Sequence, residues 1–325
     1  MKSLEIVIPV YNEADGIDAT IDHLLAAIEP LKGLVVSILV VDDGSVDDTA
    51  EKISCYSQSH PCVRLLVLTR NFGKEAAIYA GLQHTKADAA VVMDGDMQHP
   101  PGLLREMVQL WLQGFEVIEA VKVDRRSDSL LDRAFARSFY SLFSTLSGLD
   151  ITNHSDFKLL DRRAIEGYLT LPERVRFFRG LVSWMGFRTA QIPVTVPDRT
   201  AGRSSWSKKR LLRYALRALT AFSSAPLYVV TVLGAVTLLV SAVFGSIALA
   251  DKLSGNAVDG FTTVIILMLF FFSLLMGSLG MIGVYLSRIY DEVKARPIYL
   301  LDLDRSTGLT ADARTPADDS GENGV

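Results

Sequence analysis

The sequence predicts an α/β protein with a mostly parallel β-sheet, followed by two helices that are long and apolar enough to cross a membrane. Strand-like and helix-like segments alternate through the first third of the chain, a pattern that produces parallel strands joined by helices. The strand-like segments are almost continuously apolar, as expected of a sheet covered on both faces. Two later runs, 218–250 and 260–287, contain no charged residue, and each exceeds the roughly 20 residues that span a bilayer.

The expected elements follow one another in a regular order. Runs rich in β-branched and other apolar residues predict strands at 4–10, 34–41, 63–68 and 89–93. Apolar residues at helical spacing predict helices at 14–29, 47–58 and 74–84. We expect the domain built from these elements to occupy residues 1–200.

Three further regions follow this domain. Residues 201–225 combine a loop of small residues with a basic, leucine-rich segment, which predicts an amphipathic helix in the membrane headgroup region or, alternatively, one packed on the preceding domain. The transmembrane helices are expected at about 226–250 and 262–287, within a region from 226 to 288. Two buried helices of a soluble core are the alternative, but such helices usually keep a polar stripe. The tail, 289–325, is expected to be disordered from residue 305 because of its polar composition.

Basic residues gather before the first apolar run and after the second, although the net charge of the chain is only −4. Six basic residues and no acidic one lie between 200 and 217, and Arg288, Lys294 and Arg296 follow the second run. The connecting loop, 251–259, carries one lysine and two aspartates. Basic flanks stay on the cytoplasmic side, so the first domain and both termini are expected in the cytoplasm, at the inner face of the cell membrane.

Other features narrow the class of protein. The first ten residues form a short apolar run without a cleavage-type region, so no signal peptide is expected. Cys55 and Cys62 lack metal-ligand spacing and agree with a reducing compartment. Because the basic residues gather beside the apolar runs, we expect a membrane partner and no nucleic-acid partner.

Polar segments follow each of the first four predicted strands. They are residues 9–13, 42–45, 70–74 and 94–99. In open α/β sheets, ligands bind beyond the carboxyl ends of the strands. The sequence therefore predicts one shared site at this edge of the sheet.

The carboxylates in two of these segments suggest different roles. Asp94 and Asp96 lie one residue apart after a buried strand, with Gln98 nearby, and hard oxygen ligands of this kind hold Mg²⁺ or Mn²⁺. Capping of a turn is the alternative for this pair. Asp42 and Asp43 would repel phosphate, but they can accept hydrogen bonds from a base or a ribose. An N-cap role for Ser45 or Asp47 is expected beside that function.

Five segments in this order resemble the motif series of glycosyltransferase family 2. They are 8–13 (IPVYNE), 41–45 (VDDGS), 70–74 (RNFGK), 94–101 (DGDMQHPP) and 155–159 (SDFKL). Within the family, the chain is similar over about residues 4–300 to the branch of dolichyl-phosphate mannose synthases and bactoprenol glucosyltransferases. The resemblance implies a GT-A fold, a divalent metal, an inverting single displacement and a polyprenyl phosphate acceptor.

The resemblance also implies roles for individual residues. The nucleotide sugar would contact Pro9, Tyr11, Glu13, Val41, Asp43, Asp94, Asp96 and Arg203. The metal, which would neutralise the donor diphosphate, would be held by Asp94, Asp96 and Gln98. Arg203 matches an arginine of a mobile loop that closes on the donor, and a basic loop that contacts the membrane is the alternative or additional reading. The residues expected to act directly in catalysis are Asp156, Asp96 and Arg203.

The acceptor chemistry favours positioning over base catalysis. A phosphate monoester has its second pKa near 6, so it is largely an ionised nucleophile at cytoplasmic pH. It needs placement and relief of repulsion from the donor diphosphate, which arginines supply. Candidates for binding the acceptor phosphate are Arg126, Arg133, Arg137 and Arg179, with surface arginines as the alternative. We expect Asp156 to orient the acceptor or the sugar hydroxyls.

The chain departs from the family pattern at two places. Lys158 replaces the more typical arginine, and residues 119–122 (EAVK) stand where the family often has a Gly-x-Arg segment.

Transfer of glucose from UDP-glucose to polyprenyl phosphate is the favoured function. GDP-mannose or amino-arabinose donors are the alternatives within the branch. A processive polysaccharide synthase would need more membrane spans and usually a Gln-x-x-Arg-Trp motif, and a non-catalytic nucleotide-sugar-binding module would not need the metal motif. Gly277, Gly280 and Gly283 on the second apolar run would permit close helix packing, so a homo-oligomer is possible.

Overall fold

The computed structural model describes residues 1–31, 33–95, 102–122, 154–174, 176–194, 225–254 and 260–308. These residues fall into two compact units. The first contains the described residues up to 194 together with the segment 297–308, and the second contains the two long helices.

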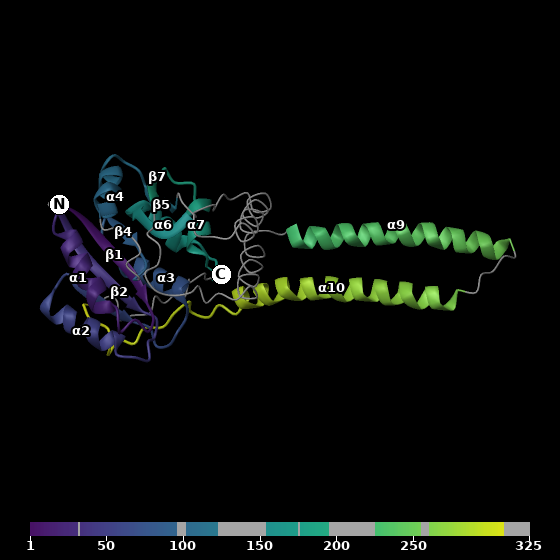
Figure 1. Ribbon diagram of the computed structural model, residues 1–325, viewed down its shortest axis with the longest axis horizontal. Coiled ribbons are helices and arrows are strands. Elements are labelled where there is room, and N and C mark those ends of the chain that lie inside the picture. The colour runs from purple at the N-terminus through teal and green to yellow at the C-terminus, as the bar shows by residue number, and fades with distance from the viewer. Residues whose placement is uncertain are drawn as a thin grey trace, which may run out of the picture. The chain divides into compact units, whose positions relative to one another are not determined.

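The first unit is built on a mostly parallel sheet of seven strands among the described residues (Figure 1). The strands are β1 Lys2–Val10, β2 Leu34–Asp42, β3 Val63–Val67, β4 Ala89–Val92, β5 Val117–Lys122, β6 His154–Asp161 and β7 Thr189–Val194. Their order is β3-β2-β1-β4-β6-β5-β7. Every pairing is parallel except those of β6, which runs antiparallel to β4 and to β5. The predicted α/β class with a mostly parallel sheet is therefore confirmed.

Helices cover both faces of this sheet. They are α1 Ile17–Ile28, α2 Thr49–Ser59, α3 Lys74–His84, α4 Gly102–Leu112, α6 Arg162–Thr170 and α7 Phe178–Trp184. All four strands and three helices predicted in the first third of the chain are present, and α3 has the predicted bounds. Helix α1 begins later than residue 14, because the amides of Gly16 and Ile17 first form a turn by donating to the carbonyl of Glu13.

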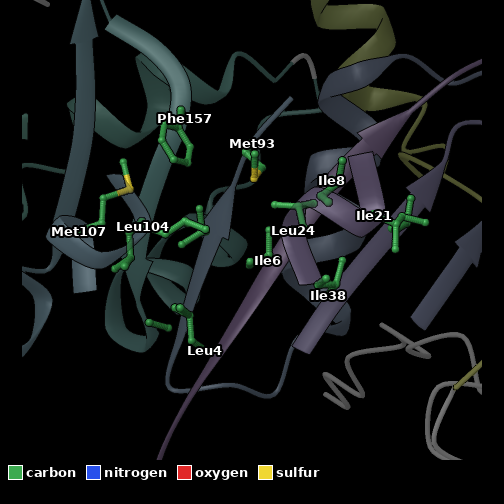
Figure 2. Close-up of a cluster of buried hydrophobic side chains, with 14 of the residues drawn as sticks. Leu4, Ile6, Ile8, Ile21, Leu24, Ile38, Met93, Leu104, Met107 and Phe157 are labelled. Atoms are coloured by element: carbon green, nitrogen blue, oxygen red, sulfur yellow. The ribbon is translucent and has the colours of Figure 1, made fainter. Parts of the chain in front are cut away.

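The core lies in two layers, one on each side of the sheet. On one side Leu4, Ile6 and Ile8 of β1 are fully buried and belong to one cluster with Leu24 of α1 and Leu104 of α4 (Figure 2). Helix α3 packs on the other side, and its Gly81 allows the approach: a Cβ there would lie 2.3 Å from Cγ1 of Val7. Burial on both faces explains why the strand sequences are almost continuously apolar.

The segment after the second long helix returns to the edge of this sheet. Asp302 N donates to Val67 O and Thr307 N to Leu65 O, each at 2.8 Å, and Thr69 N donates to Leu300 O at 3.0 Å. These bonds pair the segment with β3, whose outer edge would otherwise be open.

Side chains of this segment reach α2 and α3. The hydroxyl of Tyr299 lies 2.9 Å from Nε2 of His84 and donates to Gln83 Oε1 at 2.9 Å, and Arg305 pairs with Glu51 at 2.9 Å. The composition predicts disorder from residue 305, but residues 305–308 are hydrogen-bonded, because the pairing with β3 satisfies a segment that is polar on its own. Residues 309–325 lie outside the described part of the chain.

The second unit consists of α9 Ala225–Leu253 and α10 Phe261–Val293, which contact each other. Within the described part of the chain, two stretches are long and apolar enough to cross a membrane: Leu227–Ile247, with a mean hydropathy of 2.4, and Phe270–Val293, with 1.7. Large apolar side chains such as Leu238 and Phe272 are exposed on them. The predicted pair of long apolar helices is present, while the segment 201–224 before it lies outside the described residues.

Candidate active site

A cavity of about 430 Å³ opens at the carboxyl ends of β1, β2 and β4 and the loop after β3. Its lining residues are Pro9, Val10, Tyr11, Glu13, Asp43, Asn71, Gly73, Lys74, Asp94 and Gly95. All four polar segments expected to share one site contribute to it. Five residues expected to contact the nucleotide sugar, namely Pro9, Tyr11, Glu13, Asp43 and Asp94, lie in this lining.

The other expected site residues are placed differently. Val41 is fully buried in β2, opposite Pro9 in the register, and its Cγ2 would lie 3.1 Å from a Cβ on Gly81. Its side chain therefore packs in the core and does not line the cavity. Several expected residues lie outside the described part of the chain: Asp96, Gln98, Arg126, Arg133, Arg137 and Arg203.

Hydrogen bonds accepted by Asp43 join the loops after β2 and β3. Its two carboxylate oxygens accept from the amide of Phe72 at 2.7 Å and that of Gly73 at 2.9 Å. Gly44 has a φ of +67°, and a Cβ at this position would lie 2.3 Å from the carbonyl carbon of Arg70. Burial raises the pKa of Asp43, while the two amide bonds oppose that rise. Asp43 is thus a fixed hydrogen-bond acceptor in the lining of the cavity.

The loops after β1 and β2 are joined in the same way. Asn12, at φ +54°, donates its amide to Ser45 Oγ at 2.8 Å, and its side-chain oxygen accepts from the amide of Val46 at 3.0 Å. Ser45 also contacts the buried carboxylate of Asp42. Asp42 is therefore hydrogen-bonded within the protein. Of the two residues expected to cap α2, Asp47 accepts the amide of Thr49, the first residue of the helix, at 3.2 Å, whereas Ser45 contacts Asp42.

Two cations and two carboxylates form a continuous chain beside the cavity. The ammonium group of Lys74 lies 2.5 Å from Asp94 Oδ1 and 2.5 Å from Asp156 Oδ2. Arg179, in α7, donates to the same Asp156 through Nε at 2.5 Å and Nη2 at 2.8 Å. Asp156 comes from β6 and its side chain is only 7% exposed, so residues distant in sequence meet here.

These contacts determine the charge of Asp156. Burial alone would raise the pKa of this carboxyl, but the guanidinium of Arg179 and the ammonium of Lys74 hold its pKa well below the usual range. Asp156 therefore remains a carboxylate at any working pH and is a poor proton acceptor. Its geometry suits orientation of neighbouring cations. Arg179, expected at the acceptor phosphate, is placed against this carboxylate.

Glu75 links α3 to the start of α7. Its Oε2 accepts from the amide of Phe178 at 2.8 Å, directly before Arg179. The carboxyl end is buried although the residue as a whole is partly exposed, and burial, together with the charge of Asp156, raises the pKa of Glu75 to about 7. No role was predicted for Lys74 or Glu75 from the sequence. Lys74 ends the third polar segment, which was the available signal, whereas nothing local marks Glu75.

The two departures from the family pattern contact each other. Glu119 of β5 and Lys158 of β6 are register partners, and their charged groups form an ion pair with side chains 4% and 1% exposed. Gln191 Nε2 donates to Glu119 Oε1 at 3.2 Å. Burial lowers the pKa of Lys158, which Glu119 opposes.

The carboxylate of Asp94 fits a divalent cation. It offers hard oxygen atoms at the cavity wall, and Oδ1 already binds a cation, the ammonium group of Lys74. The described residues contain no cluster of three or more His, Cys, Asp or Glu side chains that could hold a metal ion. The other expected ligands, Asp96 and Gln98, are outside that set.

Comparisons with known proteins agree with the motifs. The family model described as glycosyl transferase family 2 matches residues 5–169. An uncharacterised glycosyltransferase of Synechocystis sp. is 36% identical over 92% of this chain and 94% of its own length. The bactoprenol glucosyl transferase of Shigella phage SfX is 35% identical over 92% of this chain and 98% of its own. Among solved structures, mannosyl-3-phosphoglycerate synthase of Rubrobacter xylanophilus is 22% identical and covers 68% of this chain and 73% of its own, with a TM-score of 0.45.

Proposed function

Because the chain belongs to glycosyl transferase family 2 and is a glycosyltransferase, we propose that it transfers a hexose from a nucleotide sugar to a polyprenyl phosphate at the cytoplasmic face of the membrane. Glucose from UDP-glucose is the proposed donor group. The strongest structural support is the cavity at the strand ends, where Lys74 and Asp94 lie in the lining and the ammonium group of Lys74 also contacts Asp156 beside it.

The lipid acceptor is supported by relatives and by the two long helices. Proteins named bactoprenol glucosyl transferase are 35% identical over almost their whole length, so they include counterparts of α9 and α10 within the aligned region. Helices with exposed apolar side chains suit a lipid environment. We place the catalytic domain and both termini in the cytoplasm, with α9 and α10 as an inner-membrane hairpin that could support a homo-oligomer.

In the proposed donor complex the nucleoside lies against Tyr11, Glu13 and Asp43. Asp94, with Asp96 and Gln98, would hold Mg²⁺ or Mn²⁺. When bound, such an ion neutralises charge on the departing diphosphate. Arg203 would close over the donor and exclude water.

The proposed reaction is one displacement with inversion. An oxygen of the acceptor phosphate forms a bond to the anomeric carbon, while the bond from that carbon to the diphosphate oxygen breaks and the nucleoside diphosphate leaves with the electron pair. No proton has to move, because the acceptor is already ionised near neutral pH. This agrees with an Asp156 whose pKa is held low. We propose that Asp156 fixes Lys74 and Arg179, and that Arg126, Arg133, Arg137 and Arg179 hold the acceptor phosphate.

The test is a transfer assay with purified full-length protein in detergent or vesicles. It combines undecaprenyl phosphate, Mg²⁺ or Mn²⁺, and labelled UDP-glucose, GDP-mannose or an amino-arabinose donor in separate reactions. We expect lipid-linked label from UDP-glucose that disappears with a chelator. Label from another donor alone would replace the proposed sugar, and nucleotide binding without label from any donor would indicate a non-catalytic module.

A further inference from the structure

Lys74 occupies the position of a counter-ion between two carboxylates. It is the first residue of α3 and lines the cavity, and its ammonium group contacts Asp94 and Asp156, each at 2.5 Å. The two carboxylates differ in the other cations that pair with them. Asp156 also has the two hydrogen bonds from Arg179, whereas Lys74 is the cation paired with Asp94 among the described residues.

A divalent cation on Asp94 would compete with this contact. Mg²⁺ binds carboxylate oxygen at about 2.1 Å and prefers a strict geometry. An ammonium group held at 2.5 Å from Oδ1 would then lie within a few ångströms of the ion, and the two positive charges would repel each other strongly in this half-buried site. The Lys74 side chain is 40% exposed and has a flexible four-carbon stem, so it can leave Asp94 while its backbone stays at the start of α3.

We propose that Lys74 is an exchangeable counter-ion that couples metal binding to donor binding. Without a metal it neutralises Asp94. When the divalent ion takes Asp94, the displaced ammonium group stays beside Asp156 and contacts the anionic donor next to Asn71 and Gly73 of the same cavity. The exchange rests on the proposed function, in which Asp94 holds the divalent ion. It makes Lys74 a donor-binding residue whose removal should affect the binding of metal and the binding of nucleotide in opposite directions.

Removing Lys74 should have opposite effects on the binding of metal and on the binding of UDP. Removing Lys74 removes a competitor, so the metal should bind more tightly in the absence of nucleotide. It also removes a cation from the donor site, so UDP should bind less tightly in the presence of metal. If Lys74 carries the coupling, UDP and metal should each strengthen the other's binding less in the variant than in the wild type.

The test measures Mn²⁺ binding to full-length protein by the loss of the free Mn²⁺ signal in electron paramagnetic resonance, with and without UDP. For Lys74→Met without UDP, we expect the dissociation constant of Mn²⁺ to fall roughly two- to fivefold, the range for partly exposed ion pairs. We also expect UDP to tighten Mn²⁺ binding less than in the wild type. Damage to the fold would weaken Mn²⁺ binding and cannot imitate this result.

Two variants serve as controls. Lys52→Met removes the same charge from another half-exposed lysine–aspartate pair, with Asp18, which does not line the cavity, and should leave Mn²⁺ binding unchanged. Lys74→Arg keeps the cation and should bind Mn²⁺ like the wild type.

Mn²⁺ binding to Lys74→Met that is equal to or weaker than in the wild type would overturn the exchange, even if the wild type transfers sugar. If Lys74→Met binds Mn²⁺ more tightly as expected but the wild type transfers no sugar, the exchange is supported and the proposed enzyme activity is wrong. Absence of any Mn²⁺ binding to the wild type would overturn both.

Discussion

Glu119 and Lys158 lie opposite each other on β5 and β6 and form an ion pair that is almost wholly buried. Each residue alone departs from the family pattern, but the two departures compensate each other because the two side chains form one ion pair. A charge buried without its partner is strongly destabilising, so either residue constrains the other. Lys158 lies on the same strand as Asp156, two residues away, so the pair fixes β6 against β5 close to Asp156.

A double-mutant cycle on this pair should show strong coupling. Glu119→Gln and Lys158→Met should each lower the free energy of unfolding by about 3–5 kcal/mol, because each leaves one buried charge unpaired. The double variant should lose clearly less than the sum of the two. Thermal or denaturant unfolding of the solubilised protein measures all four forms, and additive losses would show that the two side chains do not interact.

Asp156→Asn should impair transfer more than folding. The change keeps the shape of the side chain but removes the charge that holds Lys74 and Arg179, and misplacement of such groups costs on the order of 10²-fold in rate. Because the pKa of Asp156 is held low, the wild-type rate should show no limb from its titration between about pH 5 and 9. Steady-state transfer assays measure the rate of the variant and the pH dependence of the wild-type rate. Asp88→Asn, at an exposed position, is the control. Full activity of Asp156→Asn would remove this residue from the mechanism.

Gly44→Ala should damage the donor site, while Gly33→Ala should not. Both glycines have positive φ, +67° and +98°, but only at Gly44 would a Cβ meet the backbone of Arg70, at 2.3 Å, whereas at Gly33 nothing lies within 4 Å. The strain of a positive φ alone should lower the free energy of unfolding of Gly33→Ala by about 1–2 kcal/mol. Gly44→Ala adds the clash and should also weaken UDP binding, since it separates the loops that Asp43 joins. Equal losses of stability and unchanged UDP affinity in both variants would contradict this reasoning.

Stability should fall with rising pH because of Glu75. The pKa of Glu75 in the folded protein, about 7, lies above its ordinary value of 4.5, so its stabilising contribution is complete below about pH 4.5 and is lost as the pH rises through about 7. The loss could reach about 3 kcal/mol. Glu75→Gln stays neutral and should reduce this slope, making the variant the more stable form above pH 7. Unfolding midpoints from pH 5 to 8 measure this dependence of stability on pH. The control is Glu166→Gln, at an exposed position, which should keep the wild-type slope.

Local patterns predicted the strands β1 to β4 and the position of the cavity, but not the strands β5, β6 and β7. Strands such as β1 and β2 are buried on both faces, so their apolar runs carried the information, and the polar residues at their ends marked the cavity. Contacts between distant segments were not predictable. The pairing of Lys74 with Asp156 depends on the register of β6 beside β4, and that of Lys158 with Glu119 on the register of β6 beside β5. The direction of a single side chain was not predictable either: Val41 belongs to a motif at the cavity, but its side chain packs in the core.

The pairing of residues 300–307 with β3 has a consequence for biosynthesis. A ribosome delivers β3 early and its partner only after both long helices have emerged. Throughout that interval a nascent chain carries a bare strand edge, the kind of surface that invites aggregation. Completion of the sheet is thereby postponed until both long helices have been made, and a product truncated before this segment would keep an exposed, aggregation-prone strand edge.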